Sequence, residues 1–466
     1  MVVKNYSNLI SHGNIEGRKT ILRIIEAGLD AANPYPYIKN MMRIEDDVLF
    51  ISSNASNFEK TTSAKQTLTF DLSQIEHIYL LGGGKAVQRM AQAVEDILGD
   101  LITAGQINAK KGEAKLCERV HVTFAGHPIP DEESVKGAQR KHRIEQKITN
   151  RDLVFYFTSG GGTATLAWPA PGLTLKDIQE VTKLLYFEKG ASMPEKNRVL
   201  GKLRMPRKGK TIHAPLVYLR SSETPVAGYV YHRPFPSTNA IDILKRYKLW
   251  NQVPKSVRSH LKRVHNDPQY DAYRPPPIHS EFYYPHIHQF RVTGPEQMLK
   301  AAKICAEDQG IHSHIISSSL NDVEVQPIAE TFANIACEID RRGEPFKPPC
   351  ILIIGGELTV STEKTTGLGG RNQEFVLATA PYINGNSEII IAAIDADGAD
   401  GPTNVAGRIV DGYSMLRAEQ LGINIFEDLK NHNAYRTLTK LGDAVFTGVL
   451  GQNLRSLIMI YVRSKQ

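Results

Sequence analysis

The sequence predicts an α/β protein with two domains. Short apolar segments that are typical of buried strands alternate with longer segments whose apolar residues recur at helical spacing. Several of the expected strands run directly into glycines, as they do in open α/β sheets, where ligands lie at the carboxyl ends of the strands. The length of 466 residues exceeds the size at which one core keeps growing, so two domains are expected.

The composition is that of an ordinary globular protein. Hydrophobic residues make up 41% of the chain and charged residues 23%. No apolar run approaches the roughly 20 residues of a membrane helix, and the first residues lack the apolar core of a signal peptide. The 4 cysteines stand far apart and show no metal-ligand spacing, which predicts reduced thiols. We therefore expect a soluble, cytoplasmic protein without a membrane partner.

The formal net charge is +7, and the basic surplus gathers in Lys196–Arg220, a stretch without an acidic residue. Such a stretch can bind nucleic acid, or it can form an electropositive rim that attracts small anions. Aromatic residues are not interleaved with the cations as base stacking would require. We favour the small-anion rim and do not expect a nucleic-acid partner.

The first glycine turn follows the first expected elements, a helix over Gly17–Ala32, a polar loop over Asn54–Thr69 and a strand over Ile75–Leu81. This turn, Gly82-Gly83-Gly84-Lys85, leads into a helix, the layout that cradles phosphate at a helix N-terminus. It is not a Walker A loop, because no Ser or Thr follows the lysine, and as a dinucleotide fingerprint it is incomplete at Val87. The lysine is expected to contact a phosphate; a solvated lysine at a helix start is the alternative.

A second turn of this kind, Ser159-Gly160-Gly161-Gly162-Thr163, follows a strand expected over Asp152–Thr158. Hydroxyls at both ends of the glycine run suit a carboxylate or phosphate, and a tight turn without a ligand is the alternative. Between the two turns, a strand over Val120–Phe124 precedes His127, which we interpret as a turn residue. Helices are expected over Glu132–Ile148 and Leu173–Glu188.

The connection between the domains is expected in Asn266–His288, which is rich in Pro, Tyr and His. It places the domains at residues 1–270 and 285–466. His286 and His288 have no third ligand at a suitable spacing, so we interpret them as structural rather than metal-binding. The elements around the connection are helices over 239–251, 256–264, 294–309 and 325–341 and strands over 288–292 and 313–317.

The C-terminal part carries the chemistry of a polyanion site. Strands expected over Ile351–Ile354 and Glu388–Ile394 end in glycines and carboxylates, and the turn Gly367–Gly370 delivers Arg371 to the start of an apolar helix. Strand ends and helix N-termini of this kind hold anionic ligands. A helix around Tyr413–Leu421 and a strand over Leu457–Val462 complete the chain.

Two aspartates, Asp397 and Asp400, follow the strand that ends at Ile394. Mg²⁺ is bound in proteins by one or two carboxylates together with phosphate oxygens and water, so this pair is a candidate magnesium site. Asp-Gly sequences also form turns without a ligand, which is the alternative for either aspartate.

Several motifs resemble those of class II glycerate kinases. Gly-Gly-Glu-Leu-Thr-Val at 355–360, Gly-Gly-Arg-Asn-Gln-Glu at 369–374 and Asp-Gly-Ala-Asp-Gly-Pro-Thr at 397–403 are similar to the C-terminal MOFRL domain of that family. In the N-terminal half the similar motifs are Gly-Lys-Ala at 84–86, Gly-His-Pro-Ile-Pro at 126–130, Ser-Gly-Gly-Gly-Thr-Ala at 159–164 and Asn197. The resemblance covers nearly the whole chain.

The resemblance implies a Rossmann-like α/β/α N-terminal domain, a smaller α/β MOFRL-type domain and a cleft between them. The implied reaction is transfer of the γ-phosphoryl group of ATP to the 2-hydroxyl of D-glycerate, giving 2-phosphoglycerate, with Mg²⁺ as cofactor. Lys85 and Arg371 match the family's catalytic lysine and arginine. The expected partners are the nucleotide and a small hydroxy acid, and a homodimer is left open. The residues expected to bind nucleotide or substrate are Gly82, Gly83, Gly84, Ser159, Gly160, Gly161, Gly162, Thr163, Asn197, Glu357, Asn372 and Glu374.

Some segments depart from the family's pattern, and cations stand where that pattern has neutral or acidic residues. These cations are Arg204, Arg233 and Arg455, and they would suit a more anionic ligand. A member that acts on another hydroxy acid, or that binds anions without kinase turnover, is therefore the first alternative. A hydroxypyruvate reductase is less favoured, because the dinucleotide fingerprint is incomplete.

Overall fold

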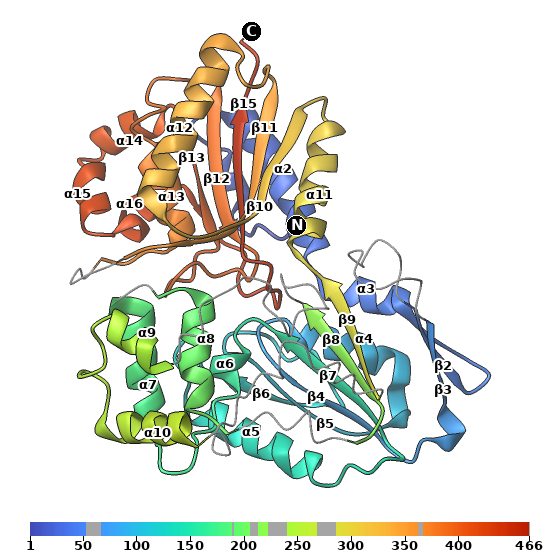
Figure 1. Cartoon of the computed structure of the whole chain (residues 1–466). Coiled ribbons are helices and arrows are strands. Elements are labelled where there is room, and N and C mark those ends of the chain that lie inside the picture. Colours follow the sequence, from blue (N-terminus) through green and yellow to red (C-terminus); the bar gives the residue numbers. More distant parts are fainter. Residues whose placement is uncertain are drawn as a thin grey trace. The chain divides into compact units, whose positions relative to one another are not determined.

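The computed structural model describes residues 1–52, 67–188, 191–205, 213–221, 240–267, 286–361 and 367–465. These residues form two compact units, each with a six-stranded sheet (Figure 1). We call Asn33–Thr293 the N-unit, and Met1–Ala32 together with Gly294–Gln466 the C-unit. The predicted α/β class is confirmed.

The N-unit sheet has six parallel strands in the order β6-β5-β4-β7-β8-β9. Counted from its first strand, this is the order 3-2-1-4-5-6 of Rossmann folds, whose ligands bind where the strand order reverses. Here the reversal lies between β4 and β7, which pair directly. The bounds are β4 (Ile78–Gly83), β5 (Ile102–Lys110), β6 (His121–Ala125), β7 (Leu153–Ser159), β8 (Leu216–Ser221) and β9 (Ile287–Thr293).

Helices surround this sheet, and a small antiparallel sheet, β1-β2-β3, lies beside it. Side chains of α3 and α4 form one core with β4, β7 and β8, while α7 to α10 form a second apolar cluster of their own. The remaining elements are α3 (Pro34–Met41), β1 (Met42–Glu45), β2 (Val48–Ser52), β3 (Thr67–Asp71), α4 (Val87–Leu98), α5 (Glu132–Glu145), α6 (Gly162–Thr165), α7 (Leu175–Lys183), α8 (Met193–Lys202), α9 (Ala240–Arg246) and α10 (Lys255–Asn266).

The C-unit sheet is mixed, in the order β10-β11-β15-β12-β13-β14. Strands β11 and β12 each run antiparallel to β15, so their carboxyl ends lie together beside the start of β15. Gly356 in β11 and Asp395 in β12 both pair with Ser456. The bounds are β10 (His312–Glu324), β11 (Cys350–Thr359), β12 (Ile389–Asp395), β13 (Gly407–Asp411), β14 (Ala444–Val445) and β15 (Ser456–Val462).

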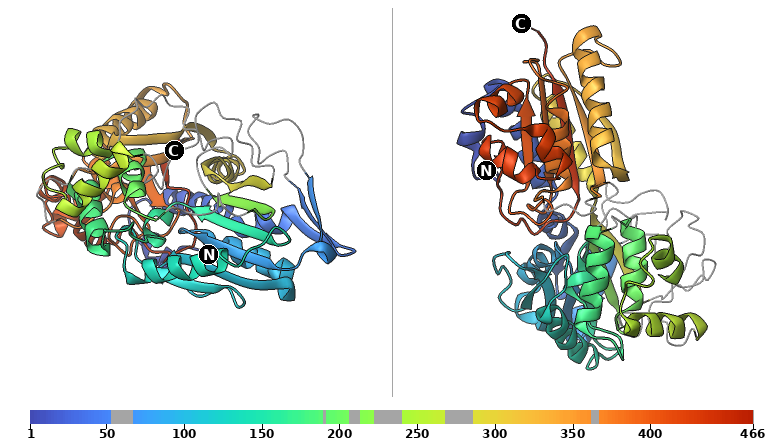
Figure 2. Two further views of the ribbon diagram at one scale, coloured as in Figure 1. Left: turned by 60° about the horizontal axis from the view of Figure 1, so that its bottom comes forward. Right: turned by 90° about the vertical axis from the view of Figure 1, so that its left-hand side faces the viewer.

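Helices cover both faces of the C-unit sheet because its central strands are apolar on both sides. One face packs against α2 (Ile15–Ala31) and α11 (Pro295–Glu307), and the other against α12 (Val325–Arg342) and α13 (Arg371–Thr379). Figure 2 shows α2 and α12 on opposite sides of the sheet. The shorter helices are α1 (Tyr6–Leu9), α14 (Ser414–Gln420), α15 (Ile425–Lys430) and α16 (Ala434–Lys440).

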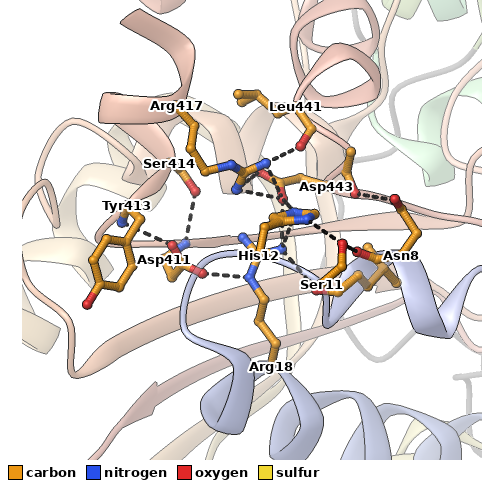
Figure 3. Close-up of polar contacts among 12 residues, drawn as sticks. Asn8, Ser11, His12, Arg18, Asp411, Tyr413, Ser414, Arg417, Leu441 and Asp443 are labelled. Carbon is orange, nitrogen blue, oxygen red and sulfur yellow. Dashed lines mark hydrogen bonds and ion pairs between the residues drawn. The ribbon is translucent and has the colours of Figure 1, made fainter. Parts of the chain in front are cut away.

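The N-terminal segment folds with the C-terminal part of the chain. Arg18 in α2 is fully buried, and it donates from Nε to Asp411 at 2.5 Å and from Nη1 to Asp443 at 2.7 Å (Figure 3). His12 and Arg417 also contact Asp443. A buried arginine needs such carboxylate partners to offset the loss of its hydration, so these contacts bind Met1–Ala32 to the C-unit.

The unit boundaries differ from the expected domains 1–270 and 285–466 at both places. Gly17–Ala32 is helical as predicted, but α2 packs on α11 and the C-unit sheet instead of the N-terminal half. The strand predicted over His288–Val292 is present as β9, which pairs with β8 and so belongs to the N-unit. The expected connection lies mostly outside the described residues, which resume at 286.

None of the described helices is long and apolar enough to cross a membrane.

Candidate active site

Two glycine turns of the N-unit lie side by side where its strand order reverses. Strand β4 leads into Gly84 and Lys85, and β7 leads into Ser159 and Gly160; the pairing of β4 with β7 extends to Gly83 and Thr158. The Lys85 amide donates to the Gly160 carbonyl at 2.9 Å, and the Ala86 amide donates to Ser159 Oγ at 2.9 Å. The two turns predicted from the sequence are therefore joined by hydrogen bonds.

The glycines in these turns allow a close approach that a side chain would block. Gly84 has φ +144°, and a Cβ there would lie 2.3 Å from Ser159 Oγ. Gly161 has φ +86°, and a Cβ there would lie 3.0 Å from both Lys85 Cγ and His127 Cδ2. The side chains of Lys85 and His127 thus both lie against Gly161. His127 was interpreted as a turn residue; its turn follows β6, which lies two strands away from β4 in the sheet.

The other predicted residues of these turns divide into buried and accessible ones. Gly82, Gly83 and Gly162 are buried, whereas Ser159, Gly160, Gly161 and Thr163 are partly exposed. Thr163 donates from Oγ1 to Asn197 Oδ1 at 2.8 Å, which brings the predicted Asn197 to the second turn. The accessible part of the N-unit site is therefore formed by Lys85, His127 and the second turn.

Two cations of the basic stretch are structural. Arg204 is buried and donates to the carbonyls of Leu200 and Thr163 at 3.2 and 2.8 Å. Lys196 is buried with its Nζ 4.1 Å from the Tyr186 ring centroid. Residues 206–212 and Arg233 lie outside the described residues, so the predicted anion-attracting rim stays a prediction.

Arg371 is the first residue of α13 and reaches the carboxyl ends of β11 and β12. Its Nη1 lies 3.0 Å from Glu357 Oε1, its Nη2 contacts Asp395 Oδ2, and its Nε donates to Ser456 Oγ at 3.3 Å. Burial would lower the pKa of Arg371, but the nearby carboxylates, Glu357 first, raise it above its ordinary value. The guanidinium is thus permanently charged, and 20% of the Arg371 side chain remains exposed.

Arg455 contacts the same carboxylate. Its Nε lies 3.0 Å from Glu357 Oε2, so Glu357 is shared by two guanidinium groups. This cation was noted in the sequence as a departure from the family's pattern, but nothing in the sequence indicated its partner.

Asp400 caps α13. One of its oxygens accepts from the Asn372 amide and side chain at 3.2 and 3.1 Å, and the other accepts from the Gln373 amide at 2.9 Å. Both Asp400 and Asn372 are buried. Burial raises the pKa of Asp400, against the lowering effect of Arg371 and these hydrogen bonds. The carboxylate thus bonds to the start of α13 and not within its own turn, and the predicted role of Asp400 as a metal ligand stays untested.

Asp397 lies between Asp395 and the capping aspartate. It is buried, and its Oδ1 accepts from the Ala399 amide at 2.9 Å. Its own amide donates to Asp395 Oδ1 at 3.2 Å. Among the described residues, three potential metal ligands come within 4.8 Å of one another at Glu76, His77 and Asp152 of the N-unit. There, Glu76 pairs with Arg151 at 2.6 Å and Asp152 accepts from the Thr149 amide at 2.6 Å.

Glu374 contacts Gln326 and His432. It is buried, accepts from Gln326 Nε2 at 2.7 Å and lies 2.8 Å from His432 Nδ1. Burial raises the pKa of Glu374 although Gln326 and His432 act to lower it. The sequence placed Glu374 in the site by its nearness to Arg371, but its carboxylate hydrogen-bonds to Gln326 and contacts His432 instead. Its geometry gives it a supporting contact between α13 and the loop before α16.

The chain is similar to known families and to known proteins. Residues 20–213 match the family described as "Domain of unknown function (DUF4147)", and residues 350–456 match the MOFRL family. The curated glycerate 2-kinase of Pyrococcus horikoshii is 32% identical over 96% of this chain and 98% of its own length. The D-glycerate 2-kinase of Thermotoga maritima is 30% identical over 83% of this chain and 90% of its own length.

A solved structure shows the same fold. The crystal structure of the Thermotoga maritima glycerate kinase has a TM-score of 0.69 and 26% identity, and the match covers 95% of this chain and 99% of that one. Because the similarity to the Pyrococcus protein extends over nearly the whole of both chains, this chain belongs to the glycerate 2-kinase family, with a DUF4147 region followed by a MOFRL region.

Proposed function

We propose that this protein transfers the γ-phosphoryl group of ATP to the 2-hydroxyl of D-glycerate. The observation that carries the proposal is Arg371, a charged and partly exposed guanidinium fixed between Glu357 and Asp395 at the carboxyl ends of two strands. Relatives that align over most of this chain carry the name glycerate 2-kinase. Phosphoryl transfer depends on positioning and on charge stabilisation rather than on covalent work by the protein.

Arg371 supplies charge stabilisation in this proposal. The guanidinium has a rigid, planar arrangement of N–H donors, which can hydrogen-bond to the equatorial oxygens of the phosphoryl group in the transition state. The carboxylates hold the guanidinium in place before the substrate arrives, so little reorganisation is needed at the moment of reaction.

Lys85 supplies the second cation. Its amide is fixed by Gly160 and its side chain lies against Gly161, so the two glycine turns hold it at the strand-order reversal of the N-unit. The proposal places Lys85 and Arg371 on the same phosphoryl group. The partly exposed hydroxyls of Ser159 and Thr163 are proposed to contact the carboxylate of D-glycerate or a phosphate.

The carboxylates of the C-unit fit a magnesium ion in chemistry and charge. Asp395 and Asp397 are acidic residues near Arg371, and the Asp397 amide donates to Asp395 Oδ1. Carboxylate oxygens are the ligands that Mg²⁺ prefers. When bound with ATP, Mg²⁺ neutralises phosphate charge. Asp395 and Asp397 would hold the ion, and Asp400 would orient α13 through its three hydrogen bonds.

A coupled assay for ADP formation with ATP, Mg²⁺ and a panel of hydroxy acids tests the proposal. Turnover that depends on D-glycerate and yields 2-phosphoglycerate supports it. Turnover with another hydroxy acid would support the first alternative. Oxidation of NADH or NADPH with hydroxypyruvate, without ADP formation, would instead show a reductase. No turnover alongside binding of ATP would indicate an anion-binding member of the family.

A further inference from the structure

Arg455 has a backbone conformation that few arginines adopt. Its φ is +65°, in the left-handed region. A side chain other than Gly, Asn or Asp is disfavoured there because its Cβ crowds the following carbonyl. The Arg455 carbonyl accepts from the Ala396 amide at 2.8 Å, which holds this bend against the loop after β12. Backbone strain of this kind persists where the surroundings impose it and is common at functional sites.

The bend directs Arg455 to Asn321 and Glu357. Its Nη1 donates to Asn321 Oδ1 at 2.6 Å, and the same oxygen accepts from the Glu357 amide at 2.8 Å. Its Nε lies 3.0 Å from Glu357 Oε2, while the other oxygen of Glu357 lies 3.0 Å from Arg371 Nη1. Glu357 is therefore held at its backbone and at its carboxylate, and Arg371 is held by Glu357.

Arg455 also sets the charge around Arg371. Arg371 faces two carboxylates, Glu357 and Asp395, and alone it would leave the site with a negative excess that repels a phosphoryl group. Arg455 adds a second positive charge beside Glu357 and so reduces this excess, to which Asp397 and Asp400 also contribute.

We propose that Arg455 is a positioning residue for Arg371, acting through Glu357. The inference rests on the proposed function, since it assumes that Arg371 stabilises the transferred phosphoryl group. It adds a residue that departs from the family's pattern and gives that residue a part in turnover. The left-handed backbone at Arg455 costs conformational free energy. An ion pair with only a structural role would not offset this cost, because a partly exposed pair contributes little to stability.

Arg463 offers a matched control. It lies just beyond the other end of β15, its Nη1 is 3.4 Å from Glu388, and 21% of its side chain is exposed, against 23% for Arg455. We compare Arg455→Asn with Arg463→Asn, since Asn tolerates a positive φ better than other side chains with a Cβ. Arg455→Lys, which keeps the charge but loses the fork of donors, is the third variant.

Kinase kinetics and melting temperatures are measured on the same full-length proteins. We expect Arg455→Asn to lower kcat about tenfold or more without lowering the melting temperature. Arg455→Lys should recover part of this kcat. Arg463→Asn should keep the kcat of the wild type. Affinity for an ATP analogue that is not hydrolysed is then measured in an Arg371→Ala background. There, Arg455→Asn should have no further effect.

Two outcomes would overturn the inference: a loss of kcat that tracks a fall in melting temperature, or an equal loss of analogue affinity with and without Arg371. If the wild type shows neither turnover nor analogue binding, the proposed function fails. The ¹⁵N–¹H signal of Arg371 Nε then decides the inference alone. An unchanged signal in Arg455→Asn contradicts positioning, and a shifted and broadened signal supports it.

Discussion

Arg371, the first residue of α13, contacts Asp395, the last residue of β12, and so joins the start of a helix to the end of a strand. The glycine-rich turn before α13 leads the chain to Arg371. The register of β12 against β15 places Asp395 opposite Ser456, and Arg371 donates to the same Ser456 at 3.3 Å. The guanidinium is therefore positioned by the backbone of three elements.

The two aspartates predicted to bind Mg²⁺ are expected to differ when each is replaced. Asp400→Ala removes the cap of α13 and should destabilise the protein by about 0.5–2 kcal/mol, the usual cost of a lost capping carboxylate. Asp397→Asn should leave the melting temperature closer to that of the wild type and raise the Mg²⁺ concentration needed for half-maximal turnover. Titration of turnover with Mg²⁺, together with thermal unfolding, checks both. A larger Mg²⁺ effect for Asp400→Ala than for Asp397→Asn would reverse the assignment.

Gly161 and Gly172 form a matched pair for testing the glycine turns. Both have φ +86°, but a Cβ at Gly161 would lie 3.0 Å from Lys85 and His127, whereas nothing lies within 4 Å at Gly172. Replacement by Ala should cost each variant a similar backbone strain, about 1–2 kcal/mol. Only Gly161→Ala should also displace Lys85 and lower kcat. Equal kcat values in the two variants would show that the contact between Gly161 and Lys85 does not affect turnover.

Asp443 makes the stability of the C-unit depend on pH. Burial would raise its pKa, but Arg18, His12 and Arg417 together lower it below its ordinary value of 3.8. Because the folded-state pKa is depressed, the contribution of Asp443 to stability is present above about pH 4 and is lost as the pH falls through the folded-state pKa. Asp443→Asn leaves Arg18 without one of its two buried partners and should cost about 3–5 kcal/mol at pH 7.

Unfolding in urea at a series of pH values from 7 downward checks this prediction. The difference in unfolding free energy between the wild type and Asp443→Asn should shrink as the pH falls below about 4. Comparison of the two proteins isolates Asp443 from Asp400, whose raised pKa acts in the opposite direction. A difference that stays constant over the series would show that the pKa of Asp443 is the same in the folded and the unfolded protein, which contradicts a lowered folded-state pKa.

Local patterns were sufficient to predict the parts of the site that consist of consecutive residues. The glycine turns and the position of Arg371 follow from a strand, a glycine run and a helix in immediate succession. Contacts between distant segments left no local signal, and so the pairing of Arg18 with Asp443 and of Glu374 with His432 could not be predicted.

The missed strand β5 shows a second limit. Its buried face carries Gln106 and Asn108, polar residues that break the apolar pattern of a parallel strand. They are tolerated because they hydrogen-bond each other at 2.8 Å and reach Thr123 and the Thr165 carbonyl at 3.0 and 2.6 Å. Such partners are known only once β6 and α6 are in place.

The most direct test of the central claim is the kinase activity of Lys85→Ala, Arg371→Ala and the double variant, with ATP, Mg²⁺ and D-glycerate. Each single variant should lose on the order of 10²-fold or more in kcat, the usual effect of removing charge stabilisation from a transition state. Lys85→Ala should keep the wild-type melting profile, whereas Arg371→Ala leaves the buried Asp395 without its ion pair and should lower the melting temperature. Because both cations are proposed to act on one phosphoryl group, the double variant should lose less than the product of the two single losses. Normal turnover in both single variants would contradict the account.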